Sequence, residues 1–337
     1  MANTFAPPPH SHAASGDERR VGLEVELSGL GVAELAEIVA TTLDGRVEEP
    51  SEPTPTCLQV ETSFGPFRIE LDSDYFKNRR YLDLLERVGV TDDGLVAKIE
   101  AQAISVASEL VPVELVSPPI PWSELETLEP LWPEIHARGG LGTHDAFRFA
   151  FGLHLNPEVP EPHDAACILP HLQAFLLLEP WLLDVEDVDW SRRVTPYIDG
   201  FPAEYAALCL APDYAPTLDV LIEDYLRHSP TRNRVFDLLP LFEHVRPGCL
   251  EGKGVEGAHL VSARPTFHYR LPNSEVGQQG WSPASAWSNW VEVERLAVDD
   301  AQRRQLATEY LASHASSPLS RVIDFIAGAS GPAGGAR

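Results

Sequence analysis

Acidic side chains alternate with apolar ones along a short segment near the start of the chain. In RVGLEVELS, residues 20–28, Glu24 and Glu26 fall on one face of an expected strand, and valines and leucines fall on the other. This follows because strand side chains alternate with a period of two. Two carboxylates on one sheet face repel each other unless water or a cation lies between them. A solvated outer face gives the same pattern, so this pair alone does not establish a site.

The same alternation recurs in four later segments, each with one apolar and one polar face. These segments are 65–74 (GPFRIELDSD), 111–118 (VPVELVSP), 147–156 (FRFAFGLHLN) and 264–271 (RPTFHYRL). An antiparallel sheet that is covered by helices on one side and open on the other would collect their polar groups in one cleft. We expect this cleft to be the active site. The polar groups are those of Arg68, Glu70, Asp72, Glu114, His154, Asn156, His268 and Arg270.

The carboxylates of these strands are candidate metal ligands. Oxygen ligands suit a hard cation such as Mg²⁺ and suit Zn²⁺ poorly as a set. His154 adds one imidazole, which fits a mixed Mg²⁺/Mn²⁺ site. Any one of these residues is more often a surface residue than a ligand, but their in-phase repetition on separate strands favours the metal site. The candidate carboxylates are Glu24, Glu26, Glu70, Asp72 and Glu114.

The sequence contains no P-loop, GxGxxG, GxSxG or HExxH motif. If the chain binds ATP, metal ions and arginines must therefore hold its phosphates. The glycine-rich stretch 251–257, EGKGVEG, lacks the GK[ST] ending of a phosphate loop, so we interpret it as a flexible loop or lid. Arg270, in the middle of the last strand, is the first candidate for the γ-phosphate, and Arg264 is the second. Arg232 and Arg234 follow Thr231, an expected helix N-cap that would suit an anion. Pairing with surface acids is the alternative use of these arginines.

Composition limits the class of protein. The chain has 337 residues, 44% of them hydrophobic, and a formal net charge of −26. Nucleic acid and anionic membranes would repel such a chain and are not expected partners. Its four cysteines form no C-x-x-C pair, which is typical of reduced thiols in a cytoplasmic protein. We found neither an apolar run of roughly 18 residues nor a signal-peptide pattern, and we expect a cytoplasmic location.

The order of elements predicts an α+β fold. Strands and helices share the first half, and helices dominate after residue 163. We expect one catalytic domain over 18–328 with a helical insertion at about 163–245, and disordered tails at 1–17 and 329–337. The expected helices are 32–43, 79–88, 97–110, 122–138, 163–178, 180–185, 203–210, 217–228, 234–244, 287–295, 301–313 and 319–326.

Several segments, taken in order, resemble the putative amidoligase family of bacteria, which is related to the glutamate–cysteine ligases and glutamine synthetases. The resemblance runs from about Val21 to about Leu311. The segments that carry it are VGLEVELSGL, FRIELDSD, PVELVSPPI, FGLHLNPE, SRRVTPYIDGFPAEY, SPTRNRVFDLLPLFEHV and RPTFHYRLPN.

The resemblance implies an antiparallel sheet curved into a funnel, with ATP and Mg²⁺ (or Mn²⁺) at its mouth. It implies that Glu24, Glu26, Glu70, Asp72 and Glu114 are metal ligands and that His154 contacts a metal or a phosphate. Glutamate–cysteine ligases carry a second histidine where this chain has Asn156, so we expect weaker binding of a second metal. The resemblance also implies a partner enzyme of the glutamine-amidotransferase or peptidase type.

The first hypothesis for function is an ATP-dependent carboxylate–amine ligase that acts through an acyl phosphate on small-molecule or peptide substrates. Arg264, Arg270 and His154 would act on the transferring phosphoryl group, and Arg232, Arg234, Asn156 and Arg68 would contact the nucleotide. A phosphotransferase of the guanidino-kinase type and a non-catalytic nucleotide-binding protein remain alternatives. The sequence leaves the two substrates and the oligomeric state open.

Overall fold

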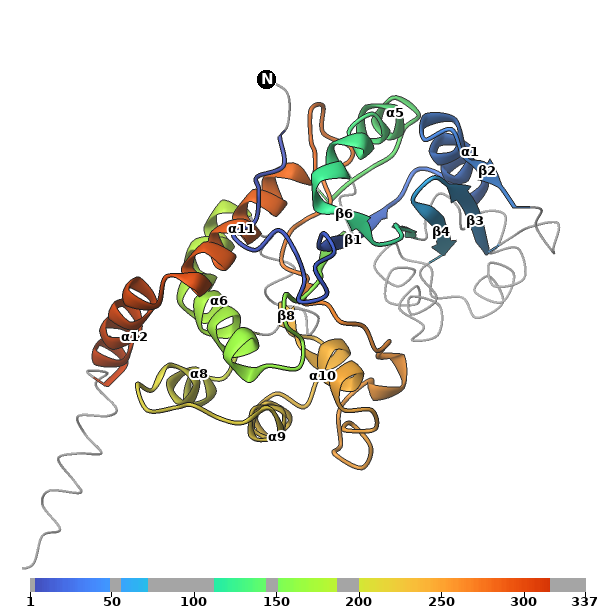
Figure 1. The fold of residues 1–337 in the computed structure, drawn as a ribbon. Coiled ribbons are helices and arrows are strands. Elements are labelled where there is room, and N and C mark those ends of the chain that lie inside the picture. Colours follow the sequence, from blue (N-terminus) through green and yellow to red (C-terminus); the bar gives the residue numbers. More distant parts are fainter. Residues whose placement is uncertain (1–3, 49–55, 72–111, 144–150, 187–199, 316–337) are drawn as a thin grey trace, which may run out of the picture.

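An antiparallel, unclosed sheet forms the centre of the α+β fold. The computed structural model describes residues 4–48, 56–71, 112–143, 151–186 and 200–315. In this part of the chain the strand order is β2-β3-β4-β5-β1-β7-β9-β8, and β6 pairs with β1 (Figure 1). Every strand pairing is antiparallel. The strands are β1 (Arg20–Leu27), β2 (Arg46–Val47), β3 (Cys57–Thr62), β4 (Gly65–Leu71), β5 (Val113–Val116), β6 (Ile120–Pro121), β7 (Leu153–Pro157), β8 (Phe236–Asp237) and β9 (His268–Tyr269).

The alternation in β1 separates its two faces as the sequence predicts. The apolar residues Val21, Leu23, Val25 and Leu27 are all buried, whereas the positions between them are partly exposed. A hairpin joins β3 and β4, with Thr62 opposite Gly65. Gly65 has a φ of 117°, which an L-residue rarely adopts, so glycine suits this turn.

Helices surround the sheet and share one hydrophobic core with it. In Figure 1, α1 and α5 lie beside the half of the sheet that contains β2, β3 and β4, whereas α6, α8, α9 and α11 lie at the other end. The helices are α1 (Val32–Thr42), η2 (Trp122–Leu128), α5 (Leu131–Ala137), α6 (Ala165–Val185), α8 (Ala203–Leu210), α9 (Leu218–His228), α10 (Leu239–Val245), η3 (Ala258–Leu260), α11 (Ala284–Val298) and α12 (Asp300–Ala315).

Two differences from the expected helices occur at prolines. The single helix expected over 122–138 is two elements, η2 and α5, and Pro130 is the N-cap of α5. A proline lacks the N–H that would continue the first helix. In α6 the prolines do not end the helix. The helices expected at 163–178 and 180–185 form one continuous helix with Pro170 and Pro180 inside it.

Three expectations around the end of the sheet are wrong. The helix expected over 234–244 begins only at Leu239, after strand β8. Thr231 caps no helix, because its Oγ1 accepts the N–H of Asn233 in a local turn. The strand expected within 264–271 is reduced to β9, with isolated bridges before and after it.

The N-terminal segment from residue 4 is ordered against the core, so the disordered tail expected over 1–17 is wrong for this part. Phe5 is buried, and the indole Nε1 of Trp287 donates to the carbonyl of Ala6 at 2.7 Å. The Arg19 guanidinium donates to the carbonyl of His10 and forms a bidentate pair with Glu294 on α11. Apolar and charge-assisted contacts together therefore hold this segment on α11.

Helix α6 is long enough and apolar enough to cross a membrane by length and composition alone. A core helix passes the same test, and α6 contributes eight residues to the buried interior. Its apolar composition is therefore explained by its place between α8 and α11.

Some expectations lie outside the described residues. These are the helices at 79–88, 97–110 and 319–326, the tail at 329–337, the first four residues of the strand at 147–156, and Asp72.

Candidate functional site

Strand register places three carboxylates side by side on one face of the sheet. Glu26 on β1 is directly opposite Glu114 on β5, and Glu114 is also opposite Glu70 on β4. Directly opposite residues share a face, with Cβ atoms about 5 Å apart. We call Glu26, Glu114 and Glu70 the carboxylate row. Glu26 also accepts the N–H of Gly152 at 2.7 Å.

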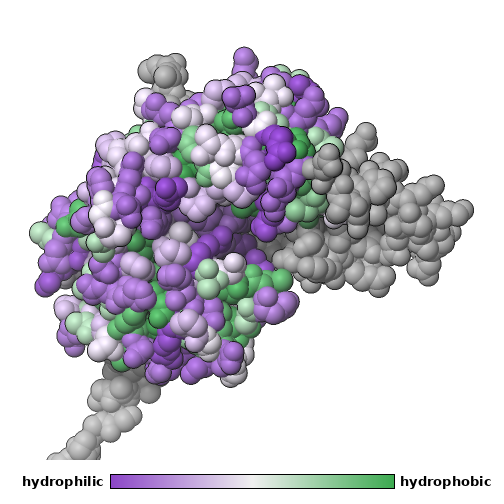
Figure 2. Space-filling model, turned by 45° about the vertical axis from the view of Figure 1, so that its right-hand side comes forward, coloured by the Kyte–Doolittle hydropathy of each residue, from purple (hydrophilic) through white to green (hydrophobic). Residues whose placement is uncertain are grey.

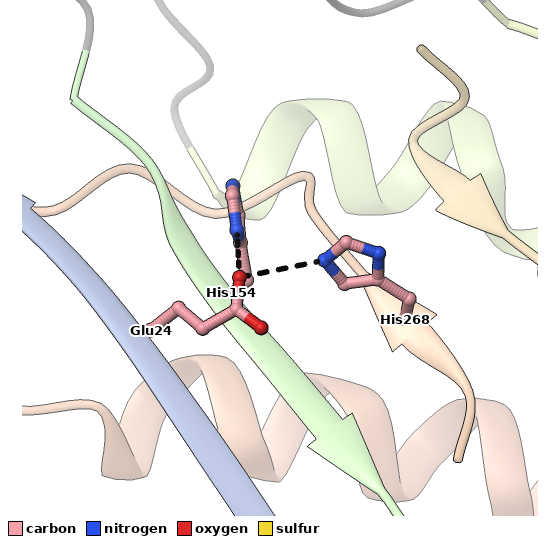
Figure 3. Close-up of side chains that lie close together, drawn as sticks. All are labelled: Glu24, His154 and His268. Atoms are coloured by element: carbon pink, nitrogen blue, oxygen red, sulfur yellow. Dashed lines mark hydrogen bonds and ion pairs between the residues drawn. The ribbon is translucent and has the colours of Figure 1, made fainter. Parts of the chain in front are cut away.

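A second set of polar residues lies on the same face, two residues away along β1. Glu24 is directly opposite His154 on β7, and β9, which carries His268, pairs with β7 on its other side. Two residues along a strand separate side chains by about 7 Å. We call Glu24, His154 and His268 the histidine cluster (Figure 3). The shared polar face inferred from the sequence is therefore confirmed for Glu24, Glu26, Glu70, Glu114 and His154.

Three donors bind the carboxylate of Glu24. His154 Nδ1 is 2.9 Å from Oε2, and the other oxygen, Oε1, accepts from Asn156 Nδ2 at 2.9 Å and from Arg264 Nη1 at 2.8 Å. Burial raises the pKa of Glu24, but the hydrogen bond from His154 and the nearby His268 and Arg264 outweigh it and hold the pKa well below its ordinary value. Glu24 is therefore ionised at neutral pH.

The two histidines of the cluster have different surroundings. Burial lowers the pKa of His154 to about 4, although Glu24 opposes this shift, so its ring is neutral at pH 7 and Nδ1–H donates to Glu24. His268 lies between two carboxylates, with Nε2 3.8 Å from Glu24 Oε2 and Nδ1 3.7 Å from Asp237 Oδ2. Its ring is edge-on to that of His154, with centroids 5.2 Å apart. Figure 3 shows both imidazoles directed toward the Glu24 carboxylate.

The candidate arginines occupy unlike positions. Arg264 lies at the edge of the cluster with its side chain 30% exposed. Arg270 is also partly buried, and it donates from Nη1 to the backbone carbonyl of Arg232 at 2.6 Å. Burial lowers its pKa, which the charge of Asp237 opposes. Arg234 is buried, donates to the carbonyl of Gly200 and lies over the ring of Phe201.

Arg68 shares the polar face at its other end. It is directly opposite Val116, which in turn is opposite Glu24. Its guanidinium is 3.3 Å from Glu70, and half of the side chain is exposed. At such exposure the ion pair contributes little to stability, so the guanidinium is free to exchange partners.

Buried polar atoms without a hydrogen-bond partner gather around Glu24. In the described part of the chain they include Asn156 Oδ1, Arg264 Nε and both ring nitrogens of His268. Buried polar groups are nearly always satisfied in native proteins, and each exception requires an explanation. A bound polar or charged ligand would satisfy these atoms. On the side drawn in Figure 2, mainly hydrophilic residues line a hollow near the middle of the molecule.

The sequence placed His268 on the polar face of RPTFHYRL, in phase with Arg270, but gave it no role in the site. It missed Asp237 altogether. Asp237 gave no signal, since its segment resembles the start of a helix. Of the named candidates, Glu24, His154, Asn156 and Arg264 are in direct contact, and Arg270 is electrostatically coupled to Glu24 and Glu26.

The chain was compared with known proteins. A family model described as a putative amidoligase enzyme matches residues 17–292. No curated protein and no solved structure matches the chain.

Proposed function

Because the chain belongs to the putative amidoligase family, we propose that it is an ATP-dependent ligase that joins a carboxylate to an amine through an acyl phosphate. The observation that carries this proposal is the polar face of the sheet. Carboxylates, imidazoles and guanidinium groups converge on it, and several of their buried atoms lack a partner. Such a face suits a highly charged ligand accompanied by cations.

The proposed reaction has two steps. The substrate carboxylate attacks the γ-phosphorus of ATP, which forms an acyl phosphate and releases ADP. The amine then attacks the acyl carbon, the amide bond forms, phosphate leaves and the amine gives up a proton. No serine or cysteine nucleophile is required, because the phosphate group activates the carbonyl carbon.

The donor set of the carboxylate row fits Mg²⁺, since its three side chains offer only oxygen ligands. Bound there, Mg²⁺ would supply neutralisation of the phosphate charge. Arg264 is the cation best placed to contact the transferring phosphoryl group, because it is partly exposed beside Glu24. Arg68, at the outer end of the same face, would contact the nucleotide. Asp72, which lies outside the described residues, remains a proposed further metal ligand.

The proposal extends to fold and substrates. The open antiparallel sheet supports a funnel of the glutamine synthetase type, with the polar face inside it. The substrates would be a small-molecule or peptide carboxylate and an amine, and an amidotransferase-like or peptidase-like enzyme would act with the chain.

Phosphate release by the purified full chain tests this function. Amino acids, polyamines and short peptides are screened in pairs with ATP and Mg²⁺. We expect release that depends on both a carboxylate and an amine, and we expect Glu24→Gln to lower it roughly 100-fold. The matched control is Glu126→Gln, at an exposed position of η2, which should keep wild-type release.

Two outcomes would contradict the ligase assignment. Formation of ADP without free phosphate would indicate a phosphotransferase. Binding of ATP without any turnover across the screen would indicate a nucleotide-binding protein.

A further inference from the structure

We propose that Glu24, His154 and His268 form a separate metal site that selects a first-row transition-metal ion over Mg²⁺. This proposal rests on the proposed function, because it assigns a different cation to one half of the same polar face. Its starting point is the donor set. Two imidazoles and one carboxylate suit Zn²⁺, Fe²⁺ or Co²⁺, whereas Mg²⁺ prefers oxygen ligands throughout.

The geometry of the three side chains fits one ion. One ligand atom from each residue lies within 4.8 Å of the other two. The carboxylate oxygen Oε2 of Glu24 is 2.9 Å from His154 Nδ1 and 3.8 Å from His268 Nε2. Metal–ligand bonds of about 2.0–2.2 Å in a tetrahedron place ligand atoms roughly 3.4 Å apart. The observed separations lie on both sides of that value, so small shifts of the two rings would bring all three atoms into coordination once the proton of neutral His154 moves from Nδ1 to Nε2.

An independent observation, the unsatisfied ring nitrogens of His268, indicates that this residue binds a ligand. Its side chain is only 7% exposed, yet neither ring nitrogen has a hydrogen-bond partner. Both nitrogens instead lie just beyond hydrogen-bond distance of the carboxylates of Glu24 and Asp237. Coordination through Nε2 would satisfy one nitrogen and would leave Nδ1 to donate to Asp237.

Neighbouring groups are arranged as outer partners of a metal site. Asp237 is buried and oriented by the N–H of Leu239, which donates to Oδ1 at 2.9 Å. Its other oxygen faces His268. Asn156 and Arg264 both bind Oε1 of Glu24, which leaves Oε2 directed at the two histidines. Carboxylates that orient a ligating imidazole are a regular feature of metal sites, and their loss costs 10–100-fold in affinity.

The histidine cluster and the carboxylate row thus offer unlike chemistry about 7 Å apart along β1. The row contributes only oxygen atoms, and Glu70 is partly open to solvent. The cluster contributes two nitrogens and one oxygen, all on buried residues. We therefore expect the face to distinguish two kinds of cation by position.

Titration with Co²⁺ in excess Mg²⁺ tests the site without recourse to activity. The metal-free full chain should bind one Co²⁺ per chain, with the visible absorption of a nitrogen-ligated ion. His268→Gln and Asp237→Asn should each weaken Co²⁺ binding by at least 10-fold and leave the calorimetric Mg²⁺ titration unchanged. Glu114→Gln should weaken Mg²⁺ binding and leave Co²⁺ binding unchanged.

Controls exclude adventitious binding by surface histidines. His163 and His244 lie with ring centroids 6.3 Å apart, so His244→Gln is the matched control and should bind Co²⁺ as the wild type does. Far-UV circular dichroism confirms that each variant is folded. If His268→Gln fails to fold, Co²⁺ binding by Asp237→Asn and the competition with Mg²⁺ in the wild type still test the proposed site.

Displacement of Co²⁺ by Mg²⁺ at comparable concentrations would overturn the proposal, as would loss of the Co²⁺ spectrum in His244→Gln but not in His268→Gln. Phosphate release in Mg²⁺ alone is measured in parallel. If it is present while the Co²⁺ site is absent, the ligase proposal stands and only this inference fails. If Co²⁺ binds as expected and no substrate pair releases phosphate, the metal-site inference stands and the ligase proposal fails.

Discussion

At the scale of single residues, the candidate site is centred on one ionised carboxylate. Glu24 accepts hydrogen bonds from His154, Asn156 and Arg264, and it is the residue through which the histidines and the arginine are connected. A buried carboxylate with several donors is rigid, so the groups that bind it are held in place before any ligand arrives. Such preorganisation is the main source of electrostatic catalysis.

The two arginines of the last strand should separate catalysis from stability. Arg264 donates to the carboxylate of Glu24, whereas Arg270 donates to a backbone carbonyl and its pKa is lowered by burial. The structure thus favours Arg264 for the phosphoryl group, the reverse of the order inferred from strand position. We expect Arg264→Gln to lower kcat about 100-fold with little change in ATP affinity. Arg270→Gln should lower the free energy of unfolding by roughly 3 kcal/mol, because it leaves buried acids uncompensated.

Steady-state kinetics, ATP binding and urea denaturation of both variants measure these effects. Wild-type turnover by Arg264→Gln would contradict a catalytic role for Arg264. Wild-type stability of Arg270→Gln would contradict a stabilising role for Arg270.

At the scale of elements, α6 packs over the last strand of the sheet and carries a buried histidine. His171 lies with its ring centroid 4.8 Å from that of Phe267, and its Nδ1–H donates to the carbonyl of Cys167 at 2.7 Å. Its Nε2 is buried without a hydrogen-bond partner. Burial lowers the pKa of His171 from 6.5 to about 4.

This shift predicts a specific loss of stability in mild acid. Between pH about 6.5 and about 4 the unfolded chain binds a proton at His171 that the folded chain does not, so stability falls as the pH falls through this window. Relative to neutral pH, the loss from this residue at pH 5 should be about 2 kcal/mol. His171→Gln should remove that part of the loss, and urea denaturation across the window measures it.

The exposed His136 provides the matched control, because His136→Gln should leave the pH dependence as in the wild type. An unchanged pH dependence in His171→Gln would show that its ring is protonated in the folded state.

Local pattern predicted the long elements of this fold and not the short ones. Alternation in RVGLEVELS defined β1, its buried face and the side on which Glu24 and Glu26 lie. Strand β8 has only two residues, too few for a period to be recognised, and the alternation in RPTFHYRL predicted a longer strand than the two residues of β9. Both strands form because β7 and the helices provide partners from distant parts of the chain, and that information is not local. Alternation placed His268 on the correct face of the sheet. Its contacts with Glu24 and Asp237 could not be inferred, because they depend on distant parts of the chain.

At the scale of the whole molecule, the N-terminal segment packs against α11, from the last part of the described chain. Arg19, just before β1, forms a buried bidentate pair with Glu294 on α11, and Trp290 also donates to Glu294. The N-terminal segment and α11 thus hold β1 from outside while its polar face stays open. Rigidity on one side and an accessible charged face on the other suit an enzyme that must position ATP and two substrates.

The central claim is that a substrate carboxylate is activated by phosphoryl transfer on this face. Oxygen-18 transfer tests it most directly, with the carboxylate substrate found by the phosphate-release screen labelled at both oxygens. The account predicts that one labelled oxygen appears in the released phosphate for each amide bond formed, as read by the isotope shift in ³¹P NMR. Unlabelled phosphate formed together with the amide would contradict the acyl phosphate.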